Sequence, residues 1–274
     1  MSHHLTVICH FRNEAVYLPY WLRHHTQLFD HGLLIDYHST DQSCDIIRKL
    51  APAWEIRHSR NKLFHSLSVD AEVMDAEREV EGWKMCLNVT EFVMHHDLKG
   101  FLTEFEDRNP GAHGVVTTGF IIQDAPDQLD LPLTEDDLWE QRHFGCPEPD
   151  PGNNGLVGRS RLLHRAPHGA YGPGRHSNDV SNLNDPPLYL FWYGWCPLFL
   201  KKARNRDTAP LVPAADLARG WGSHHVLTGE EVTATWRHKY LPRCGDLLDG
   251  RWPALNTAVE HLRGRPRRQN GRRS

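Results

Sequence analysis

Residues 5–41 read LTVICHFRNEAVYLPYWLRHHTQLFDHGLLIDYHSTD. An apolar run over 5–10 ends in the polar letters RNE, and a second apolar run over 33–35 ends in D and then STD. Between them, residues 14–29 carry apolar side chains at helical spacing, with Leu18 on the apolar side. A strand, a helix and a second strand with polar ends are the pattern of a βαβ unit.

The same alternation continues to about residue 125. Because a strand, a helix and another strand imply right-handed crossovers, we expect an α/β fold with a largely parallel sheet and flanking helices. Ligands bind such sheets at the carboxyl ends of the strands, so the polar clusters should converge on one crevice. The further expected strands are 54–57, 83–87 and 114–124, and the further expected helices are 41–50, 67–81 and 97–108.

The pattern is less regular after residue 124. Pro, Gly and Asn are frequent over 145–187, where long irregular segments are often binding loops. We expect short strands near 155–163 and 188–192. Helical spacing returns over 230–240 and 252–262.

Charge and composition exclude several classes of protein. The chain has 274 residues and a formal net charge of -4, so no overall field favours nucleic acid. We expect residues 263–274 to form a solvated, disordered basic tail, with peripheral contact to an anionic membrane or glycan as the alternative. The tail contains six arginines: Arg263, Arg265, Arg267, Arg268, Arg272 and Arg273.

The six cysteines are far apart in sequence and form no Cys-x-x-Cys pair, which favours a reducing compartment. The chain begins without a signal-peptide pattern, and no apolar run reaches membrane-spanning length. We therefore expect a cytoplasmic protein. Only His164 and His168 have the spacing of a helical zinc pair, and Pro167 between them makes a zinc-binding helix unexpected.

Several common nucleotide and hydrolase motifs are missing. Strand 5–10 is followed by no Gly-x-Gly-x-x-Gly, and the chain has no phosphate-binding Gly-Lys-Ser/Thr loop or Gly-x-Ser-x-Gly elbow. Strand 83–87 instead ends on Asn88-Val89-Thr90-Glu91. Oxygen ligands at that place would suit Mg²⁺ or Mn²⁺, although only Glu91 is a carboxylate and it could simply end the strand. Asp36 could bind a ribose hydroxyl or a base N–H, or could be an ordinary turn residue.

The first 125 residues resemble the beginning of a GT-A glycosyltransferase of the family-2-like kind. The resemblance lies in HFRNE at 10–14, in Tyr17-Leu18 and Trp21-Leu22, and in LID at 34–36 with STD at 39–41. The family commonly has Asp-x-Asp-Glu-Phe where this chain has NVTEF at 88–92. Further on, GPGRH at 172–176 resembles the segment that supplies a late histidine to the metal.

The resemblance implies a GT-A domain over 1–262, with a nucleotide-sugar-binding half at 1–125 and an acceptor side at 126–262. It implies a nucleotide-diphosphate sugar as donor and a glycan or related acceptor, as in surface-polysaccharide synthesis. Glu91 and His176 would hold Mn²⁺ or Mg²⁺; alternatively, Arg and Lys side chains replace the cation. The implied donor-binding residues are Asn13, Glu14, Asp36, Ser39, Arg60 and Asn61.

An inverting transferase also needs a base near the acceptor hydroxyl. Asp179 is our candidate, with Asp185, Glu230 and Glu231 as alternatives. A second group of residues could take part in binding, or could be core and solvated loop: the basic set Lys201, Lys202, Arg204 and Arg206, the aromatic set Trp192, Tyr193 and Trp195, and His224-His225. Two rival functions are a catalytically silent nucleotide- or sugar-binding module and a nucleotidyltransferase, although the latter's Gly-rich loop after strand one is absent.

Overall fold

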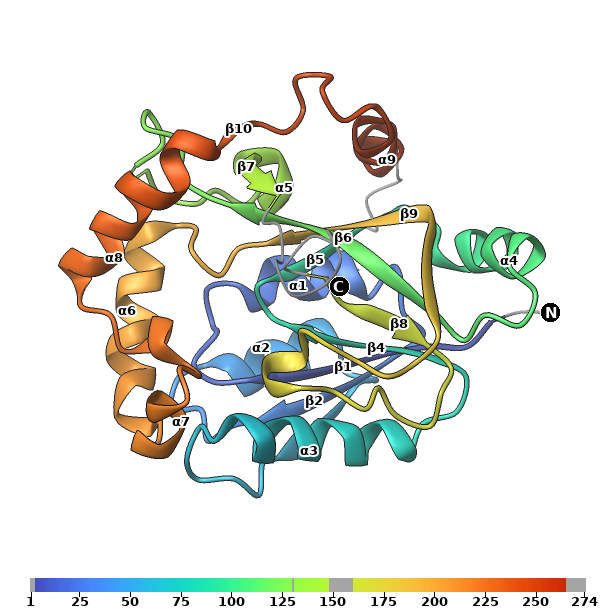
Figure 1. The fold of residues 1–274 in the computed structure, drawn as a ribbon, viewed down its shortest axis with the longest axis horizontal. Helices are drawn as coiled ribbons and strands as arrows, with labels where there is room; N and C mark the ends of the chain where they lie inside the picture. Colours follow the sequence, from blue (N-terminus) through green and yellow to red (C-terminus); the bar gives the residue numbers. More distant parts are fainter. Residues whose placement is uncertain (1–2, 130, 148–159, 265–274) are drawn as a thin grey trace, which may run out of the picture.

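The computed structural model describes residues 3–129, 131–147 and 160–264. One ten-stranded mixed sheet runs through these residues, with helices on both faces (Figure 1). The strands are β1 (Leu5–Phe11), β2 (His31–Asp36), β3 (Glu55–His58), β4 (Trp83–Asn88), β5 (Glu91–Met94), β6 (Gly114–Ile122), β7 (Phe144–Pro147), β8 (Leu162–His164), β9 (Asn182–Trp192) and β10 (Gly245–Asp246).

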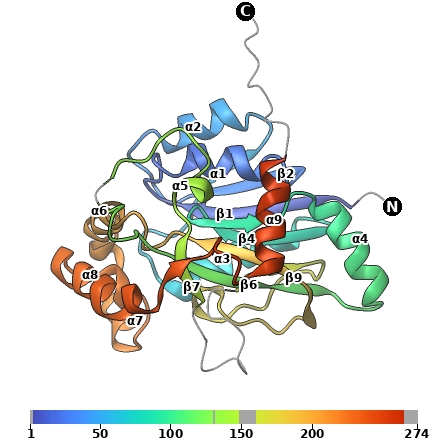
Figure 2. The ribbon, with the colours of Figure 1, turned by 90° about the horizontal axis from the view of Figure 1, so that it is seen from above.

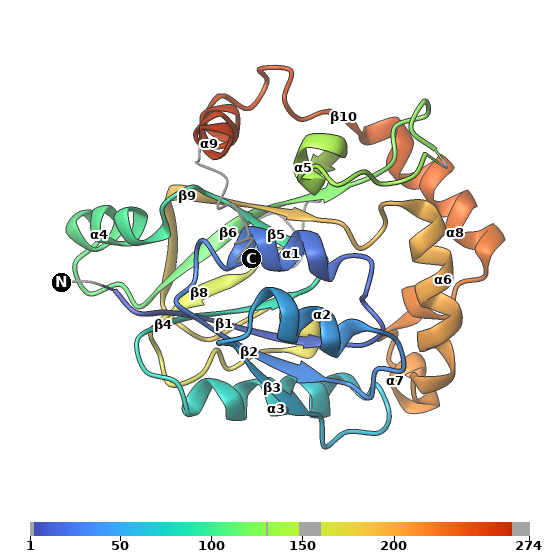
Figure 3. The ribbon, with the colours of Figure 1, turned by 180° about the vertical axis from the view of Figure 1, so that it is seen from behind.

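The helices that follow the first strands cover the two faces of the sheet. One face is covered by α3, and the opposite face by α1 and α2 (Figure 3). The helices are α1 (Leu18–His25), α2 (Ser43–Leu50), α3 (Ser66–Arg78), α4 (Leu98–Arg108), α5 (Leu138–Gln141), α6 (Leu198–Thr208), α7 (Ala214–Ala218), α8 (Gly229–Thr235) and α9 (Pro253–Arg263), with 3₁₀ turns η1 (Pro173–Arg175), η2 (Ala209–Leu211) and η3 (Ser223–His225).

The first four strands form the predicted parallel sheet, in the order β4-β1-β2-β3. Cys9 of β1 pairs with Leu34 of β2 on one side and Leu87 of β4 on the other. The order of strands reverses between β1 and β4, so the carboxyl ends of these two strands meet where ligands bind in such sheets. The predicted α/β class is therefore confirmed, and its parallel part carries the switch point.

The second half of the sheet is mixed, which the alternation of strands and helices did not predict. Strand β6 does not pair with β4, because β8 lies between them and is antiparallel to both. Strand β5 was not predicted, and it pairs with β9 in antiparallel fashion. The part of the predicted strand 155–163 that precedes residue 160 lies outside the described residues.

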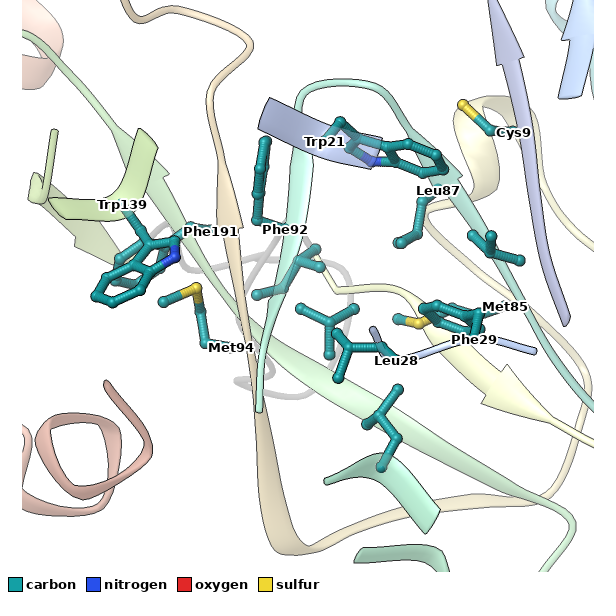
Figure 4. Packing of buried hydrophobic residues seen from close by; sticks show 14 of the residues in the cluster. Cys9, Trp21, Leu28, Phe29, Met85, Leu87, Phe92, Met94, Trp139 and Phe191 are labelled. Atoms are coloured by element: carbon teal, nitrogen blue, oxygen red, sulfur yellow. The ribbon is translucent and has the colours of Figure 1, made fainter. Parts of the chain in front are cut away.

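The main hydrophobic cluster is shared by the two predicted halves of the chain. Its members run from Leu5 in β1 to Leu262 in α9. Figure 4 shows Trp21 of α1 and Phe92 of β5 among them. The Trp21 indole also donates a hydrogen bond to the Glu91 carbonyl at 3.0 Å. The position of α1 and the course of β5 are therefore fixed together.

Helices α6, α7 and α8 stand beyond the carboxyl end of β1, at the opposite end of the molecule from α4 (Figures 1 and 2). The sequence did not predict α6, whose residues read as a core run followed by a basic loop. The predicted helix 230–240 is α8 continued by π-helical turns over 236–240, and the predicted helix 252–262 is α9.

The first residue of the predicted basic tail belongs to a helix. Arg263 is the last residue of α9, and its guanidinium pairs with Glu140 at 2.9 Å. Residues 265–274 lie outside the described part of the chain. None of the helices in the described part is long and apolar enough to cross a membrane.

Candidate functional site

A cavity of about 350 Å³ opens at the carboxyl ends of β1 and β4. Its walls come from the residues after β1 and β2, from α3, from the segment around η1, and from α6 with the loop 220–225. Several segments that are distant in sequence thus meet at the switch point of the sheet. Aromatic rings and cationic groups are prominent among the side chains on these walls.

The aromatic part of the wall is centred on Phe64. The centroid of its ring lies 5.8 Å from that of Tyr37 and 5.3 Å from that of His225, in both cases in an edge-on arrangement. The ring of His10 lies 6.0 Å away. Flat, apolar faces of this kind suit a planar ring of a ligand, because edge-on and offset contacts between aromatic rings are favourable.

The cationic part of the wall contains guanidinium groups that are held by carboxylates. Arg161 lies on the strand edge before β8, and its Nη2 and Nε donate to the two oxygens of Glu91 at 2.6 and 2.9 Å. Both side chains are at most 4% exposed. The main-chain and side-chain nitrogens of Asn88 also donate to Glu91, at 2.7 and 3.1 Å. The Glu91 carboxylate is thereby fully occupied within the protein.

Arg175 is held in the same way by α3 and β4. Its Nη1 donates to Asp70 at 2.8 Å and its Nη2 donates to the Asn88 side-chain oxygen at 2.7 Å. Asp70 also accepts from the main-chain nitrogen of Gly174 at 2.7 Å. Burial alone would lower the pKa of Arg175, but the charge of Asp70 and other neighbours raises it above the usual range. This guanidinium therefore keeps its charge.

Three polar atoms on the cavity wall have no hydrogen-bond partner among the described residues: the Tyr37 hydroxyl, His10 Nδ1 and Arg175 Nε. Tyr37 is only 1% exposed. Burial, with the charge of Glu72, raises the pKa of Tyr37 to about 12, so its hydroxyl keeps a proton to donate. A buried polar group without a partner costs about 1–3 kcal/mol. Three residues that line the cavity carry such atoms, and a ligand that bonded to them would remove this cost.

His10 adds a neutral group to this wall. Burial lowers the pKa of His10 well below its ordinary value, and the charges of Arg175 and Arg161 lower it further. The imidazole is therefore neutral near pH 7, and it presents one nitrogen as a donor or an acceptor according to its tautomer.

Of the predicted donor-binding residues at the ends of β1 and β2, Asn13, Asp36 and Ser39 do not reach the cavity wall and bond to one another and to the nearby loops. The Asn13 side-chain oxygen accepts from the Thr40 nitrogen at 2.8 Å, and the Ser39 hydroxyl accepts from the Asn13 nitrogen at 3.1 Å. Asp36 accepts from the Ser39 nitrogen at 2.9 Å. We call Asn13, Asp36, Ser39 and Thr40 the loop cluster. Its side chains join the loops after β1 and β2 and are outside the cavity wall.

Glu14 is the predicted donor-binding residue that lines the cavity. Its carboxylate meets the guanidinium of Arg204 on α6 at 3.0 and 3.2 Å. Burial raises the pKa of Glu14, and the charge and hydrogen bonds of Arg204 reduce that increase. The pair connects the loop after β1 to α6.

Arg60 and Asn61 turn away from the cavity toward α3. Arg60 pairs with Asp75, and its main-chain nitrogen donates to Glu72 at 2.8 Å. The side-chain nitrogen of Asn61 donates to the same Glu72 at 2.7 Å. Neither residue is on the cavity wall, because Glu72 and Asp75 hold this loop against the helix.

The predicted metal ligands Glu91 and His176 both lie next to the Arg161 guanidinium. They do not surround a shared site that could hold a cation. Arg161 binds the Glu91 carboxylate, and its Nη1 lies 3.5 Å from His176 Nδ1. Among the described residues, no group of three or more His, Cys, Asp or Glu side chains has the geometry of a metal site. The metal role expected for Glu91 does not fit this arrangement, because a guanidinium already takes both of its oxygens.

The remaining predicted residues divide between the cavity and other places. Asp179 is exposed and is not on the described cavity wall. Of the basic set, Lys201 and Arg204 line the cavity and both lie on α6. Trp192 also lines it, whereas Tyr193 and Trp195 are buried in the core.

The sequence reasoning missed Tyr37, Phe64, Arg161 and Arg175 as residues of the site. Tyr37 follows Asp36 directly at the end of β2, so the position of its strand end was an available signal. Arg175 stood inside the quoted GPGRH segment next to the expected ligand His176. Arg161 lies in the irregular region, within the short strand expected near 155–163, and no motif there marked it as a site residue.

No family model matches the chain, and no curated protein matches it. It is similar to the crystal structure of residues 1–349 of S. aureus TarS, at 14% identity over 69% of this chain and 60% of that one, with a TM-score of 0.39. It is also similar to the same protein in complex with UDP-GlcNAc, at 12% identity over 69% and 58%, with a TM-score of 0.36.

A third similar structure is glucosyl-3-phosphoglycerate synthase from Mycobacterium tuberculosis in complex with Mn²⁺, UDP and glucosyl-3-phosphoglycerate. The identity is 10% over 47% of each chain, with a TM-score of 0.29. The chain spans 47% to 60% of the length of these solved structures. We therefore base the function on the cavity itself.

Proposed function

We propose that the chain is a GT-A-type glycosyltransferase that moves a sugar from a nucleoside-diphosphate donor to a glycan or related acceptor. The observation that carries the proposal is the cavity at the carboxyl ends of β1 and β4, with aromatic rings on one part of its wall and guanidinium groups on another. A nucleoside diphosphate has the matching parts, a flat base and a doubly charged tail. The resemblance in residues 10–41 supports the same donor, and surface-polysaccharide synthesis is the context that it suggests.

The aromatic part would take the base. Phe64 and His225 offer ring contacts, and the Tyr37 hydroxyl offers a hydrogen bond to a base or ribose atom. The cationic part, with Arg175 and Lys201, would face the diphosphate. This division follows from chemistry alone, because stacking needs flat apolar faces and phosphate oxygens need N–H donors.

In the reaction, the bond between the anomeric carbon and the diphosphate oxygen breaks, and its electron pair stays on the diphosphate. The acceptor oxygen forms the new bond and gives its proton to a base. Fixed positive groups beside the diphosphate stabilise the charge that develops there. Asp179, an exposed carboxylate outside the described cavity wall, stays our candidate for the base.

A second candidate function is binding of the donor without turnover. The observation that favours it is that both carboxylates on the described cavity wall, Glu14 and Asp70, are already paired with arginines. Neither is therefore available as a base without losing its partner. Donor binding without transfer or hydrolysis would support this second function over the first.

The test is the unfolding temperature of the purified protein against a panel of nucleoside diphosphates. A ligand at about 100 times its Kd adds about 2.7 kcal/mol to the free energy of unfolding, so one nucleotide should raise the unfolding temperature clearly. The matching nucleotide sugars are then assayed for release of the nucleoside diphosphate. If no nucleoside diphosphate raises the unfolding temperature, the proposal fails.

A matched pair of variants connects the result to the cavity. Phe64→Ala removes the central ring of the aromatic wall and should reduce the nucleotide effect. Leu63→Ala changes the neighbouring residue, which is 53% exposed and outside the wall, and should leave the effect unchanged. Equal loss in both variants would show that the nucleotide binds elsewhere.

A further inference from the structure

The end of β4 supplies two side chains that carry oxygen toward the cavity region, and each is bonded to an arginine. The Asn88 oxygen accepts from Arg175 at 2.7 Å, and the Glu91 oxygens accept from Arg161 at 2.6 and 2.9 Å. Hard divalent cations need several oxygen ligands, preferably carboxylates. Here the oxygens that could bind a cation instead accept hydrogen bonds from guanidinium nitrogens.

The carboxylates on the described cavity wall are equally engaged. Asp70 holds Arg175 and the Gly174 nitrogen, and Glu14 holds Arg204. A divalent cation at either carboxylate would lie beside a fixed positive charge and would have to displace it. Because breaking a buried ion pair leaves an uncompensated charge, this exchange is unfavourable.

Of these arginines, Arg175 keeps a nitrogen for an anion, whereas Arg161 uses Nη1 on neighbouring carbonyls and its other nitrogens on Glu91. Arg175 is 5% exposed, lines the cavity, and keeps its Nε without a partner among the described residues. Asp70 and Asn88 hold its other two nitrogens, so the orientation of the guanidinium is fixed before a ligand arrives. Lys201 lies on the same wall, where its ammonium donates to the His224 carbonyl at 3.1 Å and faces the Trp195 ring at 4.8 Å.

We infer that this cavity binds a diphosphate group through Arg175 and Lys201, without a divalent cation. The inference rests on the proposed function for the identity of the ligand, a nucleoside diphosphate. The Arg175 guanidinium and the Lys201 ammonium supply the positive charge beside the diphosphate. Asp70 and Asn88 fix the position of Arg175, which removes much of the entropy cost of ordering a long side chain.

The experiment measures the Kd of two probes, inorganic pyrophosphate and UDP, by calorimetry in EDTA and again with excess Mn²⁺. We expect pyrophosphate and UDP to bind in EDTA, and we expect excess Mn²⁺, which itself complexes diphosphates in solution, to leave the binding unchanged or to weaken it. Binding of either probe only in the presence of Mn²⁺ would overturn the inference and leave the proposed function standing. Pyrophosphate binding in EDTA without any UDP binding would overturn the proposed function and leave the inference standing. Absence of all binding would overturn both.

Two variants test the arginines without leaving a buried charge unpaired. In the double variant Arg175→Gln with Asp70→Asn, both partners become neutral and keep a similar size. A hydrogen bond from a charged group contributes strongly to binding. We therefore expect binding of pyrophosphate to become about tenfold to hundredfold weaker. Arg78→Gln on the exposed side of α3, where Arg78 pairs with Asp75, is the matched control and should leave the Kd unchanged.

The variant Asn88→Asp tests the same point from the opposite direction. The new carboxylate would face Arg175 with one oxygen and Glu91 with the other, where the Asn88 nitrogen donates in the wild type. The guanidinium is then partly neutralised, and urea unfolding first checks that the variant folds. We expect weaker pyrophosphate binding and still no strengthening by Mn²⁺. If Asn88→Asp instead strengthened binding in Mn²⁺, the end of β4 would be a cation site and the inference would be wrong.

Discussion

The loop cluster and the cavity wall lie at the ends of the same two strands, yet their side chains have opposite bonding states. In the loop cluster, Asn13, Ser39 and Asp36 satisfy one another and the loop backbones. On the cavity wall, His10 and Tyr37 keep polar atoms without partners among the described residues. Successive residues at a strand end point to opposite sides, so Asp36 and Tyr37 serve different purposes although they are neighbours. Of the residues that carry the resemblance, Asn13, Asp36 and Ser39 join the two loops, whereas His10 and Glu14 line the cavity.

The largest expected loss of stability comes from removing one partner of the buried ion pair between Arg161 and Glu91. Arg161→Ala leaves the Glu91 carboxylate buried and unpaired, which should lower the free energy of unfolding by about 3–5 kcal/mol. Urea unfolding measures this loss. The double variant Arg161→Gln with Glu91→Gln removes both charges and should lose much less. Equal losses in the two variants would mean that the buried charge is not the cause.

Breaking the loop cluster should reduce stability but not binding. Asn13 has φ of 51° and makes hydrogen bonds to Thr40 and to Asp207. Asn13→Ala loses these bonds and places a less suitable residue at positive φ, so unfolding should become easier by about 1–2 kcal/mol. Urea unfolding gives the stability, and calorimetry gives the UDP Kd, which we expect to stay within about twofold of wild type. A large loss of UDP affinity at unchanged stability would place Asn13 in the binding site.

Removing the Tyr37 hydroxyl should give the reverse pattern. Tyr37→Phe deletes a group that has no protein partner among the described residues, so stability should not fall. Affinity for the nucleotide should fall by a factor of about 3–10, the usual value of one neutral hydrogen bond. Calorimetry with UDP checks the affinity, and urea unfolding checks the stability. Loss of stability with unchanged affinity would show that the hydroxyl serves the fold.

A smaller effect is expected from Glu14, which joins the two regions. Because its pKa is raised in the folded protein by burial, the folded state favours the protonated acid. Its contribution to stability is therefore present at low pH and is lost as the pH rises through the raised pKa. Relative to Glu14→Gln, the wild type should become less stable over that rise. Urea unfolding at a series of pH values from acid to neutral measures the difference in the free energy of unfolding between the two proteins. If the wild type gained stability relative to Glu14→Gln as the pH rose, the prediction would be wrong.

The smallest effect on binding is expected from Asp179. Its carboxylate is exposed and outside the described cavity wall, so Asp179→Asn should leave the UDP Kd within about twofold of wild type. If Asp179 is the base, the same variant lowers the transfer rate of a donor and acceptor pair severely. An unchanged transfer rate would exclude it, and Asp185→Asn would be the next variant to measure.

The parallel part of the fold was predictable, because its signals are local. The strands β1 to β4 and their helices each show a periodicity that a window of ten to twenty residues contains, and their order follows from chain connectivity. The mixed half was not predictable in this way. The place of β8 between β4 and β6 depends on pairing between distant segments, and β8 itself has only three residues.

The site was predictable in location but not in detail. The carboxyl ends of β1 and β4 do meet at the cavity, as the topology required. However, whether a polar residue faces the ligand or its own loop depends on a distant partner. Glu91 illustrates this, because the sequence around it indicates only a strand end with a carboxylate. Its partner Arg161 lies 70 positions later, and no local pattern predicts that the two side chains pair.

The contacts between the loop after β1 and helix α6 determine when the cavity can form during synthesis of the chain. Arg12 and Asn13 bond to Asp207, and Glu14 bonds to Arg204, across 190 to 195 positions of sequence. Contacts this far apart form late, because the loop that they close is long. While the chain emerges from the ribosome, the four parallel strands are present well before α6 is made. The cavity therefore closes only when most of the chain has been synthesised, and ligand binding would report a completed protein rather than a growing one.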